Sequence, residues 1–254
     1  MTTLLFSFLF SSCSEEVINI DFDVFEKSIV IEGIITDNQN PAEVKIHRIQ
    51  SYFEDNISST VSGAEVIIYD DSGNIDTLSE SAPGNYISEI IKGVPGRTYF
   101  LNVNVDGQEY KAASRMPEPI IFSQVKTEFT GTNTYNLVMT INDVPGAEEF
   151  CRILIYRNGY LKNEKMYTDI NSDGDIITII EEGFYRNDRI TIELISISKS
   201  IYTYFSDLKE LIDNEDNDSS ELVQLTAGNP KSNISNNGLG YFSAQTNRVY
   251  KRNY

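Results

Sequence analysis

The chain has 254 residues, of which 40% are apolar, with 13 Phe and 15 Tyr, so it can bury a sizeable core and is not globally disordered. Its 20 basic and 38 acidic residues give a net charge of −18 and a pI of about 4.4, a field that repels phosphate backbones and anionic membrane surfaces. We therefore expect no nucleic-acid partner. The two cysteines, Cys13 and Cys151, are too few for a disulfide framework.

The first 13 residues have the order of a secretion signal. Residues 4–10, LLFSFLF, are apolar but far shorter than the roughly 20 residues that span a bilayer, and two serines separate them from Cys13. This order resembles a bacterial lipoprotein signal, in which residues 1–12 are removed and Cys13 takes a diacylglycerol. It departs from that pattern at Phe10, where Leu is usual, and in residues 1–3, which lack Lys and Arg. The alternative is a hydrophobic strand with a fortuitous cysteine.

A short acidic run, Ser14, Glu15 and Glu16, follows the cysteine. It resembles the signal that sends lipoproteins of the Bacteroidetes group to the outer face of the outer membrane. The resemblance implies that residues 13–19 are a lipidated tether and that the protein faces the cell exterior. Each buried acyl methylene contributes about 0.8 kcal/mol, so two or more acyl chains anchor a protein stably.

From Ile18 onward apolar residues alternate with polar ones, which predicts strands. The segment TYFLNVNVDGQEYKAAS alternates and then reverses at Asp106-Gly107, a strong signal for a type I′ hairpin. Strands recur about every ten residues, with Gly, Pro or Asn between them, as in antiparallel sandwiches. We expect residues 20–118 to form an immunoglobulin-like β-sandwich.

Residues 115–119, RMPEP, predict an extended boundary, because two prolines one residue apart disfavour both helix and central strand. A second series of alternating segments follows, so residues 119–254 are expected to form a second sandwich. Within it, the apolar residues between Ile201 and Ile212 follow helical spacing and predict a helical insertion near 199–213. The fold class is thus all-β, with two tandem immunoglobulin- or fibronectin-like antiparallel sandwiches.

Two residues could carry chemistry by their type alone. Cys151 alternates with Ile153 and Ile155, which predicts a small core residue, and no histidine is near it in sequence to activate the thiol. His47 is the only histidine, and its alternation with Val44 and Ile46 places it on the solvent side of a strand. A catalytic triad or a zinc site would need His47, and no partner pattern accompanies it.

The segment DINSDGD is the sharpest local motif. Asp169, Asn171, Asp173 and Asp175 are spaced two apart, with a glycine at the turn, as in the first half of a calcium loop. The closing Glu of such a loop is expected at position twelve, which is Ile180 here. The alternative is an acidic hairpin turn that uses Asp-Gly for its positive φ. Calcium is therefore the one cofactor that the sequence suggests.

No enzyme motif is present: the sequence has no glycine-rich phosphate loop, no GxSxG and no HExxH. Pairs of carboxylates, as glycosidases use, carry no information in a chain with 38 acids. We expect a protein that is not an enzyme. The Asn-rich segment SNISNNGLGYF is either a ligand-facing loop or a loop entering the last strand, with Tyr241 or Phe242 filling the core.

Three segments together resemble a known family. They are SIVIEGIITDNQNPAEVKIHRIQSYFED, GVPGRTYFLNVNVDGQEYKAASRMPEP and NPKSNISNNGLGYFSA, and with the N-terminus they resemble the Bacteroidetes lipoprotein family called domain of unknown function 4249. The resemblance implies tandem β-sandwiches on an outer-membrane lipoprotein, often encoded beside a TonB-dependent receptor. The family has no established activity, so no catalytic residue is carried over.

Our preferred hypothesis is a surface lipoprotein that acts as a non-catalytic binding or accessory component of a TonB-dependent uptake complex. The alternative is a structural or adhesive surface module stiffened by calcium. An enzyme such as a glycosidase ranks third, because no sequence feature selects a particular pair of carboxylates.

Overall fold

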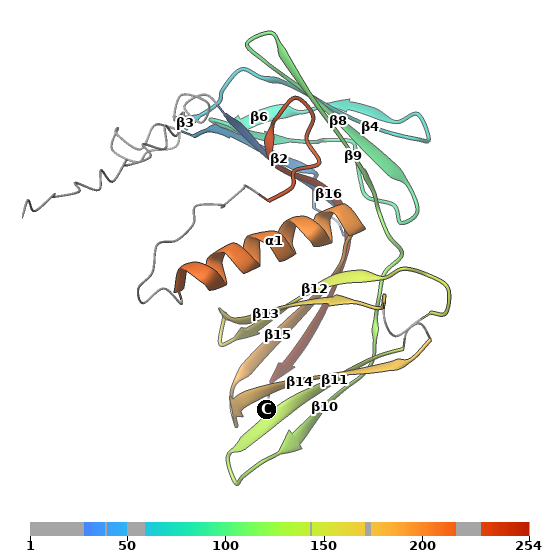
Figure 1. Ribbon diagram of the computed structural model, residues 1–254, viewed down its shortest axis with the longest axis vertical. Helices are drawn as coiled ribbons and strands as arrows, with labels where there is room; N and C mark the ends of the chain where they lie inside the picture. Colours follow the sequence, from blue (N-terminus) through green and yellow to red (C-terminus); the bar gives the residue numbers. More distant parts are fainter. Residues whose placement is uncertain are drawn as a thin grey trace, which may run out of the picture.

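The computed structural model describes residues 28–38, 40–49, 59–142, 144–170, 174–216 and 230–253. These residues form sixteen strands and one helix, arranged as two β units with the helix at the side of the second (Figure 1). The expected all-β class is confirmed. The signal residues Cys13, Ser14, Glu15 and Glu16 lie outside the described residues.

The first unit packs two sheets face to face around one hydrophobic cluster. Buried and half-buried residues alternate along β1, as the period of two in the sequence requires. The predicted hairpin is present, since Asp106 and Gly107 have φ values of 51° and 81° between two paired strands. One sheet contains β1 (Ile29–Thr36), β2 (Glu43–Arg48), β3 (Ser59–Thr60), β6 (Ser79–Ala82) and β7 (Asn85–Ile87); the other contains β4 (Glu65–Asp70), β5 (Ile75–Thr77), β8 (Thr98–Val105) and β9 (Gln108–Arg115).

The second unit is also a pair of sheets around a separate cluster. Its smaller sheet has the order β10-β11-β14, so β10 is an outer strand. The strands are β10 (Phe122–Phe129), β11 (Thr134–Asn142) and β14 (Ile176–Tyr185), opposite β12 (Phe150–Arg157), β13 (Tyr160–Thr168), β15 (Arg189–Ser196) and the last part of β16 (Leu239–Asn253).

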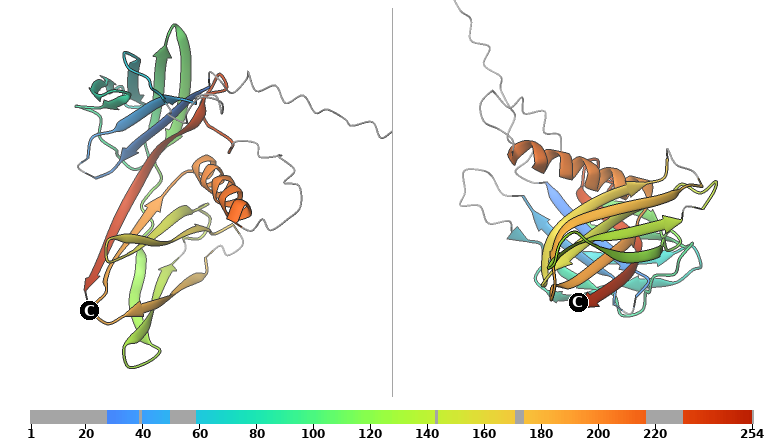
Figure 2. Two further views of the ribbon diagram at one scale, coloured as in Figure 1. Left: turned by 90° about the vertical axis from the view of Figure 1, so that its left-hand side faces the viewer. Right: turned by 90° about the horizontal axis from the view of Figure 1, so that it is seen from below.

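Strand β16 joins the two units (Figure 2). Its first half, from Leu239 to Gln245, runs parallel to β1, and its second half, from Thr246 to Asn253, is antiparallel to β15. One nine-stranded sheet therefore passes through both units. Gly240 permits this junction, because a Cβ there would lie 2.2 Å from the carbonyl oxygen of Ile31.

The predicted helical insertion is helix α1 (Lys199–Asp216). It covers the outer face of the β12–β15 region, where Phe150, Ile195 and Phe205 belong to a third hydrophobic cluster (Figure 2). The ring of Tyr241 on β16 lies 4.9 Å from that of Phe205, so the helix also packs against the joining strand. Among the described residues, no helix is both long and apolar enough to cross a membrane.

Candidate functional site

Cys151 is a core residue, as its alternation predicted. It lies on β12, is fully buried and belongs to the same hydrophobic cluster as Ile153 and Ile155. Burial raises the pKa of the Cys151 thiol, so the thiolate is disfavoured at neutral pH. The residue therefore stabilises the second core and has no reactive thiolate.

His47 occupies β2 and is half-buried on the face opposite Val44 and Ile46. Its strand neighbours in the sheet are Val30 and Thr60, neither of which is a metal ligand or an acid. In the described part of the chain, no three His, Cys, Asp or Glu side chains gather in a way that could hold a metal ion.

The predicted calcium segment is divided by the limits of the described residues, since Asn171 and Asp173 lie outside them. Asp169 is buried, and its Oδ1 accepts a hydrogen bond of 2.9 Å from the backbone N–H of Glu149, whereas Asp175 is exposed. Strands β13 and β14 belong to different sheets, so this segment connects two sheets. The alternative of a hairpin turn is wrong, because a hairpin requires its two strands to pair with each other.

The buried carboxylates are held by structural hydrogen bonds. Asp76 Oδ2 accepts from the Ser88 hydroxyl at 2.5 Å and from the backbone N–H groups of Glu89 and Ile90, each at 3.0 Å. Burial alone would raise the pKa of Asp76, but these donors lower it below its ordinary value. The charge therefore fixes the loop after β7.

Glu181, unlike Asp76, is held by charged side chains. Its two oxygens lie 2.6 Å from Lys162 Nζ and 3.0 Å from Lys165 Nζ, and Asn163 donates a third bond of 3.0 Å. Burial opposes ionisation, but the hydrogen bonds from these side chains lower the pKa of Glu181. The carboxylate stays ionised, which is opposite to what a glycosidase acid needs.

The segment SNISNNGLGYF is a structural loop, which supports the second interpretation of the sequence. Asn233 Oδ1 accepts from the backbone N–H of Phe242 at 2.9 Å, and its Nδ2 donates to the Phe242 carbonyl at 2.8 Å. Ser235 exchanges two hydrogen bonds with Lys111 on β9, of 2.7 and 2.8 Å. Phe242 is fully buried in the first core. The loop thus fastens the last strand to the first unit.

Three turns of the second unit meet at the end of the sandwich where β16 finishes, and we call residues 129–134, 157–161 and 185–189 the loop end. The backbone N–H of Arg186 donates to the carbonyl of Asn133 at 2.9 Å. Asn158 exchanges two bonds with Arg189, of 2.8 and 2.9 Å. These bonds hold the three turns as one surface.

Exposed aromatic rings beside arginines distinguish the loop end. Tyr160 is 81% exposed, Phe129 57% and Tyr185 50%. The Arg186 guanidinium lies 5.3 Å from the Phe129 ring, and the Arg157 guanidinium lies 5.1 Å from the Tyr185 ring. The sequence pattern does not reveal this group, because its members come from three turns that are distant in the chain.

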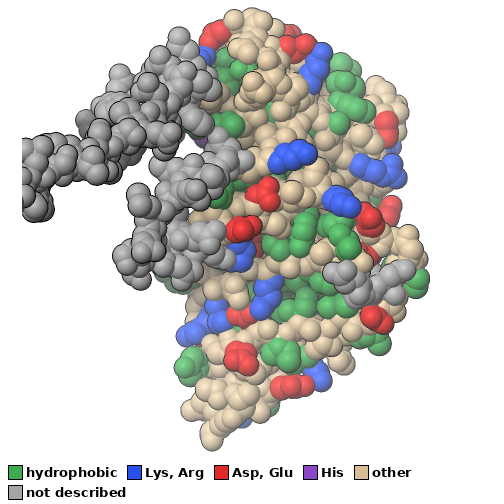
Figure 3. Space-filling model, viewed as in Figure 1, with side chains coloured by type: hydrophobic (Ala, Val, Ile, Leu, Met, Phe, Trp, Pro, Cys, Tyr) green, Lys and Arg blue, Asp and Glu red, His purple; other side chains and the backbone are tan. Residues whose placement is uncertain are grey.

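The loop end is basic within an acidic protein. It contains three arginines, Arg157, Arg186 and Arg189, and one acid, Asp188. Asp188 lies 3.1 Å from Arg157, which leaves the exposed side chains of Arg186 and Arg189 facing solvent. Figure 3 shows side chains of both signs of charge interspersed with hydrophobic ones over one face of the molecule.

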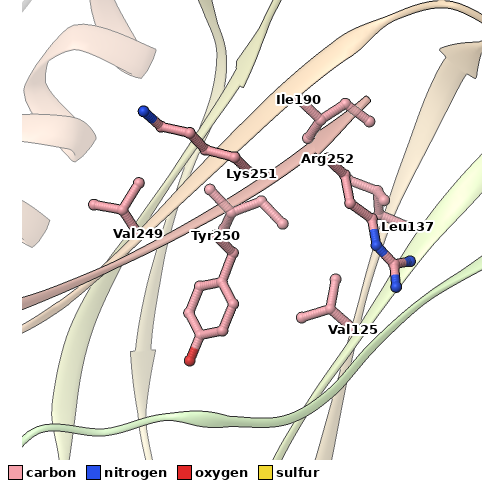
Figure 4. A pocket seen from close by; sticks show the side chains of 8 residues that line it. Val125, Leu137, Ile190, Val249, Tyr250, Lys251 and Arg252 are labelled. Atoms are coloured by element: carbon pink, nitrogen blue, oxygen red, sulfur yellow. The ribbon is translucent and has the colours of Figure 1, made fainter. Parts of the chain in front are cut away.

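A pocket of about 320 Å³ lies between the two sheets of the second unit, beside β10 and the end of β16 (Figure 4). Val125, Leu137, Ile190 and Ile192 line it together with residues 249–252 of β16. Tyr250 is fixed at its border, since its hydroxyl accepts from the Phe122 N–H at 3.1 Å and the two rings lie 5.1 Å apart. The lining is mostly apolar, and it contains no acid and no histidine.

No curated protein matches the chain. Two solved structures are similar to parts of it, each with a TM-score of 0.22. The Yersinia pseudotuberculosis adhesin InvE is 16% identical over 66% of this chain and 55% of its own, so the chain spans about half of that adhesin. The chicken interferon gamma receptor alpha chain is 9% identical over 67% of this chain and 89% of its own. These scores are too low to carry any conclusion about function.

One family model matches most of the chain. The model described as "Domain of unknown function (DUF4249)" matches residues 15–251, which include every strand and the helix described above except the last two residues of β16. The chain belongs to the DUF4249 family.

Proposed function

We propose that this protein is a non-catalytic binding component of a surface uptake complex that contains a TonB-dependent receptor. In this proposal a lipid on Cys13 holds the protein to the outer membrane, and the loop end contacts the partner. The loop end is the observation that carries the proposal. Tyr and Arg are the residue types most enriched at the energetic centres of protein interfaces, and Tyr, Gly, Asn and Arg are prominent in the binding loops of immunoglobulin domains.

The charge of the loop end favours an acidic surface on the partner. Electrostatic interactions fall off over about 8 Å at physiological ionic strength, so an approaching surface experiences the nearby arginines more strongly than the net charge of −18. Arg186 and Arg189 are exposed, and the Arg186 guanidinium lies 5.3 Å from the exposed ring of Phe129. A partner that buries these rings would pair its acids with these arginines.

The direction of β16 supports this orientation. Ser28 directly precedes β1, whose Val30 lies beside Leu239 at the start of β16. The loop end lies where β16 finishes, since Arg189 pairs with Asn253. Fifteen residues at about 3.3 Å each make β16 about 50 Å long. A tether attached before Ser28 would therefore leave the loop end pointing away from the attachment point.

The buried carboxylates support the proposal that the protein is non-catalytic. Asp70, Asp76, Glu181 and Asp188 are buried, and hydrogen-bond donors lower the pKa of each despite the opposing effect of burial. Each is held by its own donors in a turn or between strands. A glycosidase acid needs the opposite shift, and the pocket lining contains no carboxylate and no histidine.

Co-purification tests the proposal. The tagged, acylated protein is solubilised in mild detergent, and we expect mass spectrometry to identify a TonB-dependent receptor with it. Arg186→Glu/Arg189→Glu should reduce receptor recovery at least tenfold. The matched control is Lys92→Glu/Arg115→Glu, which makes the same charge change on exposed residues of the first unit. A monomer free of receptor under these conditions contradicts the proposal.

A structural or adhesive module is the second candidate, and the position of the acidic segment favours it. Asp169 and Asp175 flank the connection between the two sheets of the second unit, where a bound calcium ion would stiffen the sandwich. A rise in the melting temperature with calcium, together with no recovery of a receptor, would favour this function over the first.

A further inference from the structure

The second sandwich has an open side. Beyond Gln245, the only strand neighbour of β16 in the described part of the chain is β15, and β10 is likewise the outer strand of the opposite sheet. These two edges border the pocket described above (Figure 4). An outer strand presents backbone N–H and C=O groups that can pair with an added strand.

The register shows what an added strand would meet there. Tyr250 and Arg252 lie opposite Ile192 and Ile190, so these residues share the inner face and border the apolar pocket. Val249 and Lys251 alternate to the outer face, and Figure 4 shows their side chains directed away from those of Tyr250 and Arg252. A complementary strand therefore needs apolar side chains on one face and acidic side chains on the other.

The chain itself contains such a sequence outside the described residues. Residues 17–26 read VINIDFDVFE, in which Ile18, Ile20, Phe22 and Val24 alternate with Asn19, Asp21 and Asp23. If Ile18, Ile20, Phe22 and Val24 faced the pocket, Asp21 and Asp23 would lie on the face that carries Lys251. Cross-strand pairs of opposite charge are favourable. The segment has both the period and the charge that the open side requires.

The same copy cannot supply this strand. Ser28 lies near Leu239 at the start of β16, and Val249 is ten residues further along, about 33 Å away at 3.3 Å per residue. Phe22 precedes Ser28 by six residues, which span at most about 22 Å when fully extended. A segment centred on Phe22 would have to come from another molecule.

We propose that the open side binds residues 17–26 of a second copy of this chain as an added β-strand. Two copies that donate to each other form a closed dimer. Ile20, Phe22 and Val24 fill the pocket, and Asp21 and Asp23 lie beside Lys251. No residue that lines the pocket belongs to the loop end, so the inference does not depend on the proposed receptor.

The test is the oligomeric state of the full chain carrying Cys13→Ser, which removes the acylation site. Sedimentation equilibrium should show a dimer. Asp21→Lys/Asp23→Lys should weaken dimerisation at least tenfold, and adding Lys251→Glu to this variant should restore it. An excess of a synthetic peptide of residues 17–26 should convert the dimer to monomers, and the peptide with both aspartates replaced by lysine should not. Circular dichroism spectra identical to that of the parent protein would show that the variants are folded.

Two results would overturn the inference. One is a monomer at every protein concentration up to the solubility limit. The other is a dimer that persists unchanged both in Asp21→Lys/Asp23→Lys and in excess peptide, since that dimer would use a different surface. Receptor co-purification, measured separately on the acylated protein, reports on the proposed function alone.

Discussion

The two units are sandwiches of similar design, yet only in the first is an outer strand beside β16 covered by another part of the chain. In the first unit, the outer strand β9 is covered by the Asn-rich loop, where Ser235 bonds Lys111 and Asn236 Nδ2 donates to the Glu109 carbonyl at 3.2 Å. In the second unit, no described strand pairs with the outer edge of β10 or with β16 beyond Gln245 on the side away from β15. On the side that β16 follows, the first unit is closed and the second is open, whereas elsewhere both units have outer strands, such as β5 and β13.

Two buried carboxylates, one in each unit, have different kinds of partner. Asp76 in the first unit accepts hydrogen bonds from neutral donors, a hydroxyl and backbone N–H groups, whereas Glu181 in the second unit lies between two lysines. Neutral donors are insensitive to salt, while ion pairs are weakened by it. The contribution of Asp76 to stability is therefore expected to change less with ionic strength than the contribution of Glu181.

The largest expected effect comes from Phe242→Ala. Phe242 is fully buried in the first core, although it lies more than 200 residues after β1. Removing its ring should lower the free energy of unfolding by about 3–5 kcal/mol, measured by urea denaturation. Val249→Ala on the open side of the same strand should change it by less than about 0.5 kcal/mol. Equal losses in the two variants would mean that β16 is not divided between a closed and an open unit.

Asn233→Ala tests the cover over the first unit. It removes two hydrogen bonds to the backbone of Phe242 and should cost about 1–3 kcal/mol. Hydrogen exchange should quicken in β9 and in the first half of β16, with β12 and β15 unchanged. Uniform quickening in both units would contradict the separation.

Calcium should act on the second unit alone. If the segment from Asp169 to Asp175 binds calcium, a concentration ten times Kd should stabilise the protein by about 1.4 kcal/mol. Scanning calorimetry measures the shift, and Asp175→Asn is the variant expected to abolish it. If millimolar calcium does not shift the melting temperature, calcium is not a cofactor of this protein.

The smallest effect is a difference in pH dependence. The folded-state pKa of Asp76 lies below the ordinary value of 3.8, so its contribution to stability is complete above pH 3.8 and is lost as the pH falls further through the folded pKa. The stability difference between the protein and Asp76→Asn should therefore shrink below pH 3.8 at any salt concentration. The corresponding difference for Glu181→Gln should fall on adding salt already at pH 7. If salt affects the two differences equally, the contrast between the units is wrong.

Local sequence was sufficient to predict the elements that depend only on interactions between neighbouring residues. Asp106-Gly107 and Asn158-Gly159 both adopt positive φ values at hairpin turns, because Gly, Asn and Asp tolerate that region. The spacing between Ile201 and Ile212 was sufficient for helix α1, and alternation identified Cys151 as a core residue. The acidic segment after β13 was misleading, since a turn sequence does not reveal whether the flanking strands pair.

The sequence by itself determined the all-β character, the helix, the hairpins and the family. Each of these depends on neighbouring residues or on an ordered set of short segments. Only the tertiary structure decided that β16 belongs to both units, that β13 and β14 lie in different sheets, and that the three turns of the loop end meet. Strand pairing between distant residues is chosen by the fit of whole faces, and a period of two is the same whichever partner a strand takes.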